Sequence, residues 1–261
     1  MKFKLGADPE LFLKDASNAF ISVIGKIGGT KENPMPLPIG EGFAVQEDNV
    51  ALEYNIPPAD SREALVSNIE GIMAFLGDHV KTLGLYFAKE SAAIFPEEQL
   101  MDPRALEFGC DPDFNAWDNG KVNPRPRAPD WRLRSCGGHI HVGHKFGSKD
   151  DHINFIKYMD LFLAVPSTVQ DQGDLRKQLY GKAGAFRFKP YGAEYRVLSN
   201  YWTLDRKLIE WVWDATTLAV DAWQNKKVDV DAEKDTILAA VNFNQKDAAQ
   251  HLIQKYKLLT A

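Results

Sequence analysis

Pairs of polar residues two positions apart recur in four segments whose other residues are mostly apolar. The pairs are Asp8 and Glu10, Glu53 and Asn55, His139 and His141, and Glu194 and Arg196. Side chains at positions i and i+2 project from the same side of a strand. Clustered carboxylates repel one another unless cations neutralise them, and oxygen-rich sites with an imidazole suit Mg²⁺ or Mn²⁺. The four pairs therefore predict a divalent-cation site on one face of a sheet.

Each pair also has an ordinary structural interpretation. An Asp-x-Glu pair is typical of a solvated strand face, a His-x-His pair also occurs in cores and on surfaces, and a Glu-x-Arg pair commonly forms an ion pair within one strand. Four such pairs in one chain, beside glycine-rich turns, favour a shared site.

A glycine-rich cationic segment occupies residues 176–200. Its basic residues include Arg176, Lys182, Arg187, Lys189 and Arg196. In a chain with a formal net charge of -5, this segment suits a transferring phosphoryl group. The sequence holds neither GxxxxGK[ST] nor GxGxxG, so a nucleotide would need another type of site. The arginines at 125, 127, 132 and 134 form either a solvated basic loop or a site for phosphate or a substrate carboxylate.

Hydrophobic periodicity places the elements that would position these residues. Alternation predicts strands over 2–13, 50–56, 133–143 and 191–199. Helices are predicted over 60–84, 149–165, 204–225, 231–241 and 245–259, the first with a capping box from Asp60 to Glu63. Residues 95–130 are expected to be an ordered loop. This order favours an α+β fold with an antiparallel sheet over a doubly wound parallel sheet.

The composition excludes several classes of protein. The chain has 261 residues, 44% of them hydrophobic and 26% charged, which is enough to bury a core. Its negative net charge gives no strong nucleic-acid signature, and neither a membrane-spanning stretch nor a signal peptide is evident. Cys110 and Cys136 are expected to be reduced thiols of a cytoplasmic protein, with a single bridge between them left open.

Five stretches resemble the phage-type carboxylate–amine ligases of the glutamine synthetase and glutamate–cysteine ligase superfamily. They are GADPELFL (6–13), QEDNVALEYNIPPA (46–59), FGCDPDFNAW (108–117), CGGHIHVG (136–143) and LYGKAGAFRFKPYGAEYRVLSN (179–200). The resemblance implies a glutamine synthetase-like domain, a curved antiparallel sheet with helices packed on one face. Residues 1–203 would form the ligase core, and residues 204–261 would be C-terminal helices completing the same domain.

The resemblance also implies roles for individual residues. Glu10 and Glu53, with Glu47 as a third carboxylate, match the ligands of a metal ion near the substrate. Asp8, His139 and Glu194 match the ligands of a metal ion that bridges the ATP phosphates, although the family usually has Glu at position 8. His141, Arg176, Lys182, Arg187 and Arg196 match the nucleotide-binding set. Arg196, Arg187 and Glu53 are the expected catalytic residues.

The implied reaction joins a carboxylate to an amine with ATP and Mg²⁺ or Mn²⁺, through an acyl phosphate. The substrates would be small molecules or peptides, and Asp111 and Asp113 either contact the amine or form an Asx turn. Relatives often form rings or dimers, so a homo-oligomer is one expectation, in the host cytoplasm if the chain is phage-encoded. Two alternatives stay open: a metal-dependent hydrolase that uses the His-x-His and carboxylate site, and a non-catalytic nucleotide- or ligand-binding protein of the same fold.

Overall fold

The computed structural model describes residues 3–107, 112–171 and 173–261. Its largest sheet has six antiparallel strands in the order β1-β13-β15-β14-β10-β11. These are β1 (Lys4–Ala7), β13 (Ile140–Gly143), β15 (Gly192–Tyr195), β14 (Ala185–Lys189), β10 (Phe114–Asn115) and β11 (Lys121–Val122).

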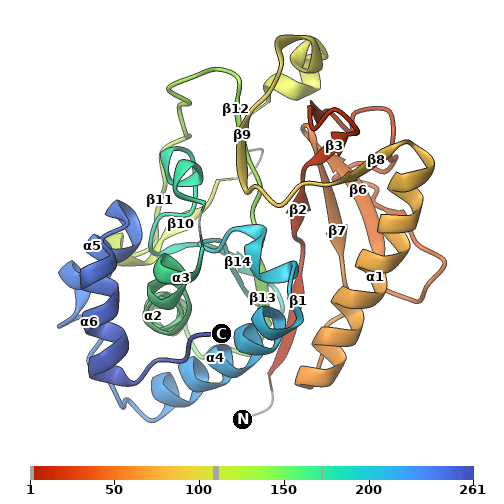
Figure 1. Cartoon of the computed structure of the whole chain (residues 1–261). Helices are drawn as coiled ribbons and strands as arrows, with labels where there is room; N and C mark the ends of the chain where they lie inside the picture. Colours follow the sequence, from red (N-terminus) through yellow and green to blue (C-terminus); the bar gives the residue numbers. More distant parts are fainter. Residues whose placement is uncertain (1–2, 108–111, 172) are drawn as a thin grey trace.

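A second antiparallel sheet continues from the first, in the order β2-β7-β6-β5. Its strands are β2 (Glu10–Leu11), β7 (Ala51–Asn55), β6 (Ala44–Asp48) and β5 (Met35–Pro36). Tyr54 N donates to Pro9 O and Ile56 N to Ala7 O, so the chain around β7 runs beside both β1 and β2. The two sheets therefore meet along residues 4–11 (Figure 1).

Two small antiparallel sheets complete the strands. One consists of β4 (Phe20–Ile21), β3 (Leu13–Asp15) and β8 (Leu85–Phe87), and the other of β12 (Leu133–Ser135) and β9 (Ala92–Ile94). In Figure 1, β9 and β12 and the turns joined to them rise above the main sheets.

The helices pack against one another on the apolar side of the sheets. They are α1 (Arg62–Thr82), α2 (Lys149–Met159), α3 (Val165–Gln170), α4 (Arg206–Gln224), α5 (Lys234–Phe243) and α6 (Lys246–Tyr256), with a π-helical turn (Asp160–Ala164) between α2 and α3. α4 contacts α1 and α2, while α3 contacts α5 and α6. Leu5, Val142 and Tyr195 point from the strands into this core. The prediction of an α+β fold with an antiparallel sheet is thus confirmed.

Several element boundaries differ from the sequence prediction. The strand predicted over 2–13 is three short strands, because Pro9 has no N–H to donate to a ladder. The strand predicted over 133–143 is divided into β12 and β13 by Gly137 and Gly138. Strands β6 and β14 were missed, since AVQED ends in consecutive polar residues and AFRFK lies in the segment interpreted as a cationic loop.

Two further predictions were wrong in detail. The N-cap of α1 is Ser61, not Asp60, because Ser61 is extended and its Oγ accepts from Ala64 N. Residues 95–130 contain more regular structure than expected, namely β10, β11 and the 3₁₀ turns Glu97–Leu100, Pro103–Leu106 and Ala116–Asp118. Within the described residues, no helix is long and apolar enough to cross a membrane.

Candidate active site

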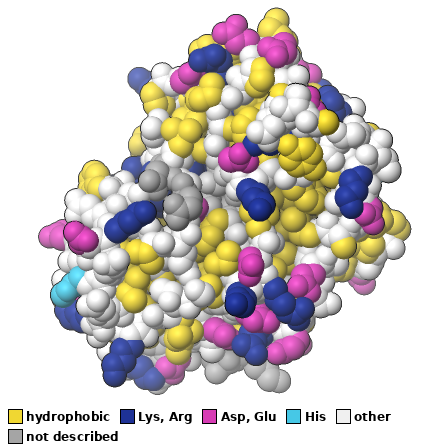
Figure 2. All heavy atoms as spheres, viewed as in Figure 1, with side chains coloured by type: hydrophobic (Ala, Val, Ile, Leu, Met, Phe, Trp, Pro, Cys, Tyr) yellow, Lys and Arg dark blue, Asp and Glu magenta, His cyan; other side chains and the backbone are white. Residues whose placement is uncertain are grey.

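A cavity of about 660 Å³ opens on the polar face of the two main sheets. It is bordered by residues of both sheets, including Asp8, Glu10, Glu53, His139, His141, Arg187 and Arg196. Figure 2 shows acidic and basic side chains interspersed on one side of the molecule, rather than a patch of one sign. A second, more open cavity of about 690 Å³ lies where α2 meets the chain after α4, and none of the predicted site residues lines it.

Three carboxylates form an acidic trio at one end of the cavity: Glu10, Asp48 and Glu53. Glu10 faces Glu53 across β2 and β7, and one oxygen of each carboxylate lies within 4.8 Å of the others. Burial, together with the nearby Asp48, raises the pKa of Glu10 to about 7. Burial also raises the pKa of Asp48, and it raises that of Glu53 further, with Asp8 and Asp48 adding to the effect. Such a group keeps protons unless a cation replaces them.

The structure does not bring Glu47 into this trio. Gln46 pairs with Glu53 in the ladder, so Gln46 and Asp48 share the face of Glu53 while Glu47 points the other way. The Glu47 carboxylate instead accepts four backbone N–H bonds of 2.9–3.0 Å from residues 25–28. These bonds lower the pKa of Glu47 although burial opposes them. Strand parity within QED (46–48) could have identified Asp48 instead.

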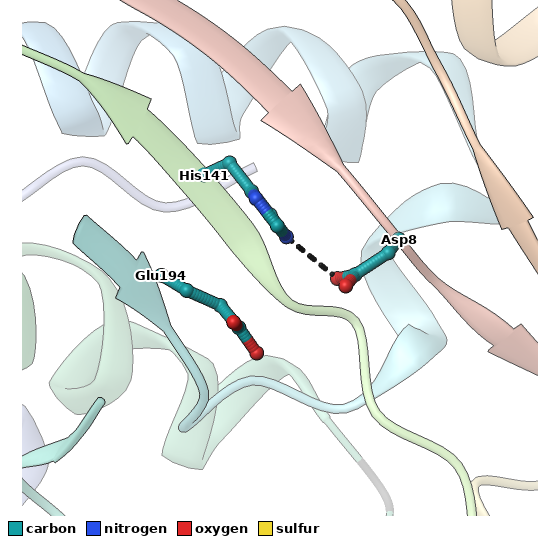
Figure 3. Close-up of side chains that lie close together, drawn as sticks. All are labelled: Asp8, His141 and Glu194. Atoms are coloured by element: carbon teal, nitrogen blue, oxygen red, sulfur yellow. Dashed lines mark ion pairs between the residues drawn. The ribbon is translucent and has the colours of Figure 1, made fainter. Parts of the chain in front are cut away.

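A second cluster contains Asp8, His141 and Glu194, which come from three neighbouring strand segments (Figure 3). His141 lies opposite Glu194 in the ladder between β13 and β15. Its Nε2 is 3.0 Å from Asp8 Oδ1, yet the two buried atoms do not have hydrogen-bond geometry with each other or with any other described residue. The two side chains form an ion pair, drawn dashed in Figure 3, and Asp8 raises the pKa of His141 although burial opposes it. Together with Glu194 they offer three ligand atoms close enough to hold a metal ion.

His139, which the sequence analysis grouped with Asp8 and Glu194, also borders this cluster. Its Nδ1 is 3.4 Å from Asp8 Oδ1 and 4.0 Å from Glu194 Oε1. Burial and the nearby Arg196 lower the pKa of His139 to about 4, so the ring is neutral at pH 7. Gly137 is required here, because a Cβ at that position would lie 2.3 Å from His139 Nε2.

Cationic side chains surround Glu194, which is fully buried. Arg196 NH1 donates to its Oε1, Lys189 Nζ is 2.7 Å from Oε2, and Arg187 NH1 is 3.4 Å from Oε1. Burial acts to raise the pKa of Glu194, but Arg196 and the histidines outweigh it and lower the pKa to about 2. Lys189 was not among the predicted site residues, although it shares the face of Arg187 on β14 by the period of two.

Two predicted nucleotide-binding residues are engaged by other parts of the chain: Arg176 borders the cavity but donates to backbone carbonyls, and Lys182 lies away from the cavity. Arg176 is 2% exposed, and its guanidinium donates to Val197 O at 2.8 Å and to Arg196 O at 3.4 Å, so it supports the backbone beside Arg196. Lys182 does not line the cavity; its Nζ lies 3.2 Å from Asn242 O at the end of α5. Asn242 Oδ1 also accepts from Ala183 N at 2.7 Å, which fixes the glycine-rich turn to α5.

The remaining predicted residues are only partly described. Asp111 and Cys110 lie outside the described residues, whereas Asp113 Oδ2 is 3.9 Å from Arg196 Nε. Cys136 is a buried free thiol, and burial raises its pKa well above the usual value. The acidic trio and the cluster of Asp8, His141 and Glu194 can hold two divalent cations side by side. Arg187, Lys189 and Arg196 form a cationic wall at the cluster that contains Glu194.

Residues 128–256 match the model of a family described as Phage phiEco32-like COOH.NH2 ligase-type 2. The resemblance inferred from the sequence motifs is thereby confirmed over a segment that includes the His139, Glu194 and Arg196 region. None of the curated proteins matches the sequence. Among solved structures the chain is similar to a bifunctional glutathione synthetase from Pasteurella multocida, with 13% identity and a TM-score of 0.44, covering 98% of this chain and 49% of that one. The chain thus spans about half the length of that protein.

Proposed function

We propose that this chain, which matches the phage-type carboxylate–amine ligases over residues 128–256, joins a carboxylate to an amine with ATP as co-substrate. One observation carries the proposal: an acidic trio with raised pKa values and a cluster rich in arginine and lysine line the same cavity. The first suits a metal ion alone, and the second suits a metal ion together with phosphate. A glutamine synthetase-like sheet, with residues 204–261 completing the domain, is part of the proposal.

The residues present fit two divalent cations. Glu10, Asp48 and Glu53 would hold one, because their raised pKa values reflect three buried carboxylates without enough positive charge. Asp8, Glu194 and a histidine, His141 or His139, would hold the other. When bound, Mg²⁺ or Mn²⁺ would supply Lewis-acid stabilisation of negative oxygens.

The chain's own contribution to phosphoryl transfer would come from the cationic wall. A carboxylate oxygen of the acid forms a bond to the γ-phosphorus of ATP as the bond to ADP breaks. Arg187, Lys189 and Arg196 would stabilise the charge on the transferring group. The amine nitrogen then bonds to the acyl carbon, loses one proton and releases inorganic phosphate. A hydrolase would have no need of this wall, so the wall favours the ligase over the hydrolase alternative.

We propose that the acid and the amine are small molecules or peptides of the cytoplasm. We also propose that the chain forms a homo-oligomer. The test is to incubate the protein with Mg-ATP and pooled host metabolites, and to search by mass spectrometry for a pair that condenses with loss of water. Hydroxylamine in place of the amine should trap the activated acid as a hydroxamate. We expect ADP and phosphate; release of AMP and pyrophosphate would contradict the acyl-phosphate route.

A further inference from the structure

Beside the acidic trio, the polar face of β6 and β7 changes from carboxylates to carboxamides. Gln46 lies directly opposite Glu53 in the ladder, and Asn55 is the next residue of β7 on that face, opposite Ala44. Both side chains line the cavity. Opposite positions on antiparallel strands have Cβ atoms about 5 Å apart. A group bound at Gln46 would therefore lie next to Glu53, a member of the trio.

Gln46 is buried, but its side chain does not hold any described part of the chain in place. It is 4% exposed, and its carboxamide makes no hydrogen bond to any residue that the structure describes. Asn49, three residues later, shows the contrast: its amide nitrogen donates to Arg104 O, Ala105 O and Glu107 O. The enclosed polar atoms that lack a partner do not include those of Gln46, so its carboxamide reaches the cavity that it lines. The Gln46 carboxamide therefore has free capacity that faces the cavity.

The pair can recognise only certain chemical groups. A carboxamide offers donors and an acceptor and carries no charge, so it matches a peptide group, which has one N–H and one C=O. An α-carboxylate at these amides would face the carboxylates of the trio without an opposite charge, and an α-ammonium would lie beside the divalent cation that the trio is proposed to hold. The turn at Gly29 lies against the backbone edge of β6, where Gly29 O accepts from Glu47 N at 3.4 Å and a Cβ at Gly29 would be 2.4 Å from Val45 O. Gly29 also lines the cavity, so this turn borders the two carboxamides at the edge of the sheet.

We propose that Gln46 and Asn55 form an amide-binding subsite, so that the acid substrate is a peptide or an N-acylated amino acid rather than a free amino acid. The statement that the acid reacts beside the trio rests on the proposed function; the subsite itself rests on Gln46, Asn55 and the cavity. The carboxylate would lie at the cation of the trio, and the neighbouring peptide group on the two carboxamides.

A matched pair of probes tests the subsite without turnover. N-acetyl-L-alanine and O-acetyl-L-lactate have the same shape and carboxylate, but the second has an ester oxygen in place of the peptide N–H. Their affinities for the full chain in excess Mg²⁺, without ATP, can be measured by saturation-transfer NMR. We expect the amide probe to bind about tenfold more tightly, which corresponds to one hydrogen bond to a buried group.

Two substitutions locate the effect. Gln46→Met, which keeps the length of the side chain, should reduce the ratio of the two affinities to about one by weakening the amide probe alone, and Asn55→Leu should lower the ratio independently. Gln250→Leu, on the exposed surface of α6, should leave both affinities unchanged. Equal affinities in the unsubstituted protein, binding of neither probe, or tighter binding of free L-alanine than of N-acetyl-L-alanine would overturn the subsite. A tenfold ratio in a protein that cleaves no ATP would instead contradict the ligase and leave the subsite standing.

Discussion

The two carboxylate clusters in the cavity have opposite pKa shifts, although Glu194 is fully buried and Glu10 is partly exposed. Burial acts to raise the pKa of Glu10 and of Glu194 alike, yet the pKa of Glu10 rises to about 7 and that of Glu194 falls to about 2. The neighbours differ: Glu194 has three cationic side chains in ion-pair contact, whereas Glu10 contacts the Gly137 N–H and has Asp48 nearby. Nearby charge, more than burial, therefore decides the protonation state.

This difference separates two kinds of site. At the trio a cation would replace protons, because the charges of Arg196 and Arg176 lower the pKa of Glu10 less than burial and Asp48 raise it. At Glu194 the cations are already part of the protein, so a metal ion there would compete with Arg196 and Lys189 for the same oxygens. Those side chains could then turn to a phosphate, since a guanidinium binds phosphate oxygens as readily as carboxylate oxygens.

The largest effect is expected from Arg196→Ala. The substitution removes a contact that should strengthen mainly in the transition state, so turnover should fall by a factor of about a hundred to a thousand, or about 3–4 kcal/mol. The affinity for ATP should change much less. Steady-state kinetics and ATP titration separate the two quantities, and near-normal turnover would show that the wall does not serve phosphoryl transfer.

The pH dependence of stability should distinguish the two clusters. Glu10 has a raised pKa, so the folded state holds its proton more tightly than the unfolded state, and the free energy of unfolding should fall as pH rises from about 4.5 to about 7. The full effect is roughly 3 kcal/mol. Glu194 has a lowered pKa, so its contribution is lost only as pH falls from about 4.5 to about 2.

Burial also raises the pKa of Asp160 to about 7 and lowers that of Lys177 to about 7, so denaturant unfolding between pH 5 and pH 8 measures the part due to Glu10 as the difference between the unsubstituted protein and Glu10→Gln. Excess Mg²⁺ should restore the stability lost at the higher pH, and Glu10→Gln should flatten the profile. A profile of Glu10→Gln that matches the unsubstituted protein would assign the pH dependence to other groups.

The metal affinity of the trio should depend on Asp48 and not on its neighbour Glu47. Asp48→Asn removes one negative ligand and should weaken Mn²⁺ binding about tenfold to a hundredfold, the equivalent of a charged contact. Calorimetric titration with Mn²⁺ at pH 8 measures the change. Unchanged affinity in Asp48→Asn would remove Asp48 from the site.

The smallest effect is expected from Glu47→Gln, the matched control. Its carboxylate holds the turn at residues 25–28 through four N–H bonds, so the substitution should lower the free energy of unfolding by about 1–3 kcal/mol. Mn²⁺ affinity should be retained. A loss of Mn²⁺ binding comparable to that of Asp48→Asn would restore Glu47 as a ligand.

The sequence was informative where a period of two decides the geometry. Glu10 and Glu53 face each other, and His141 faces Glu194, because alternation fixes which side each strand residue occupies. The sequence was uninformative where hydrogen bonds to the backbone determine the role of a side chain. Nothing in the sequence shows that Arg176 donates to backbone carbonyls, or that Glu47 accepts from the turn at residues 25–28. Glu47 and Asp48 are adjacent acids, and only the register of β6 against β7 distinguishes them.

The contact between Asn242 and the turn at Ala183 has a consequence for how the chain can vary. None of the five stretches that resemble the ligase family lies beyond residue 200, yet the last turn of α5 holds the segment that leads into Arg187. Substitutions on the outer surface of α5 and α6 are free to accumulate. A shift of one residue in the end of α5 would instead withdraw Asn242 and loosen the strand that carries the cationic wall. The end of α5 is therefore part of the framework that supports the cavity, because Asn242 contacts the turn before the strand that carries Arg187.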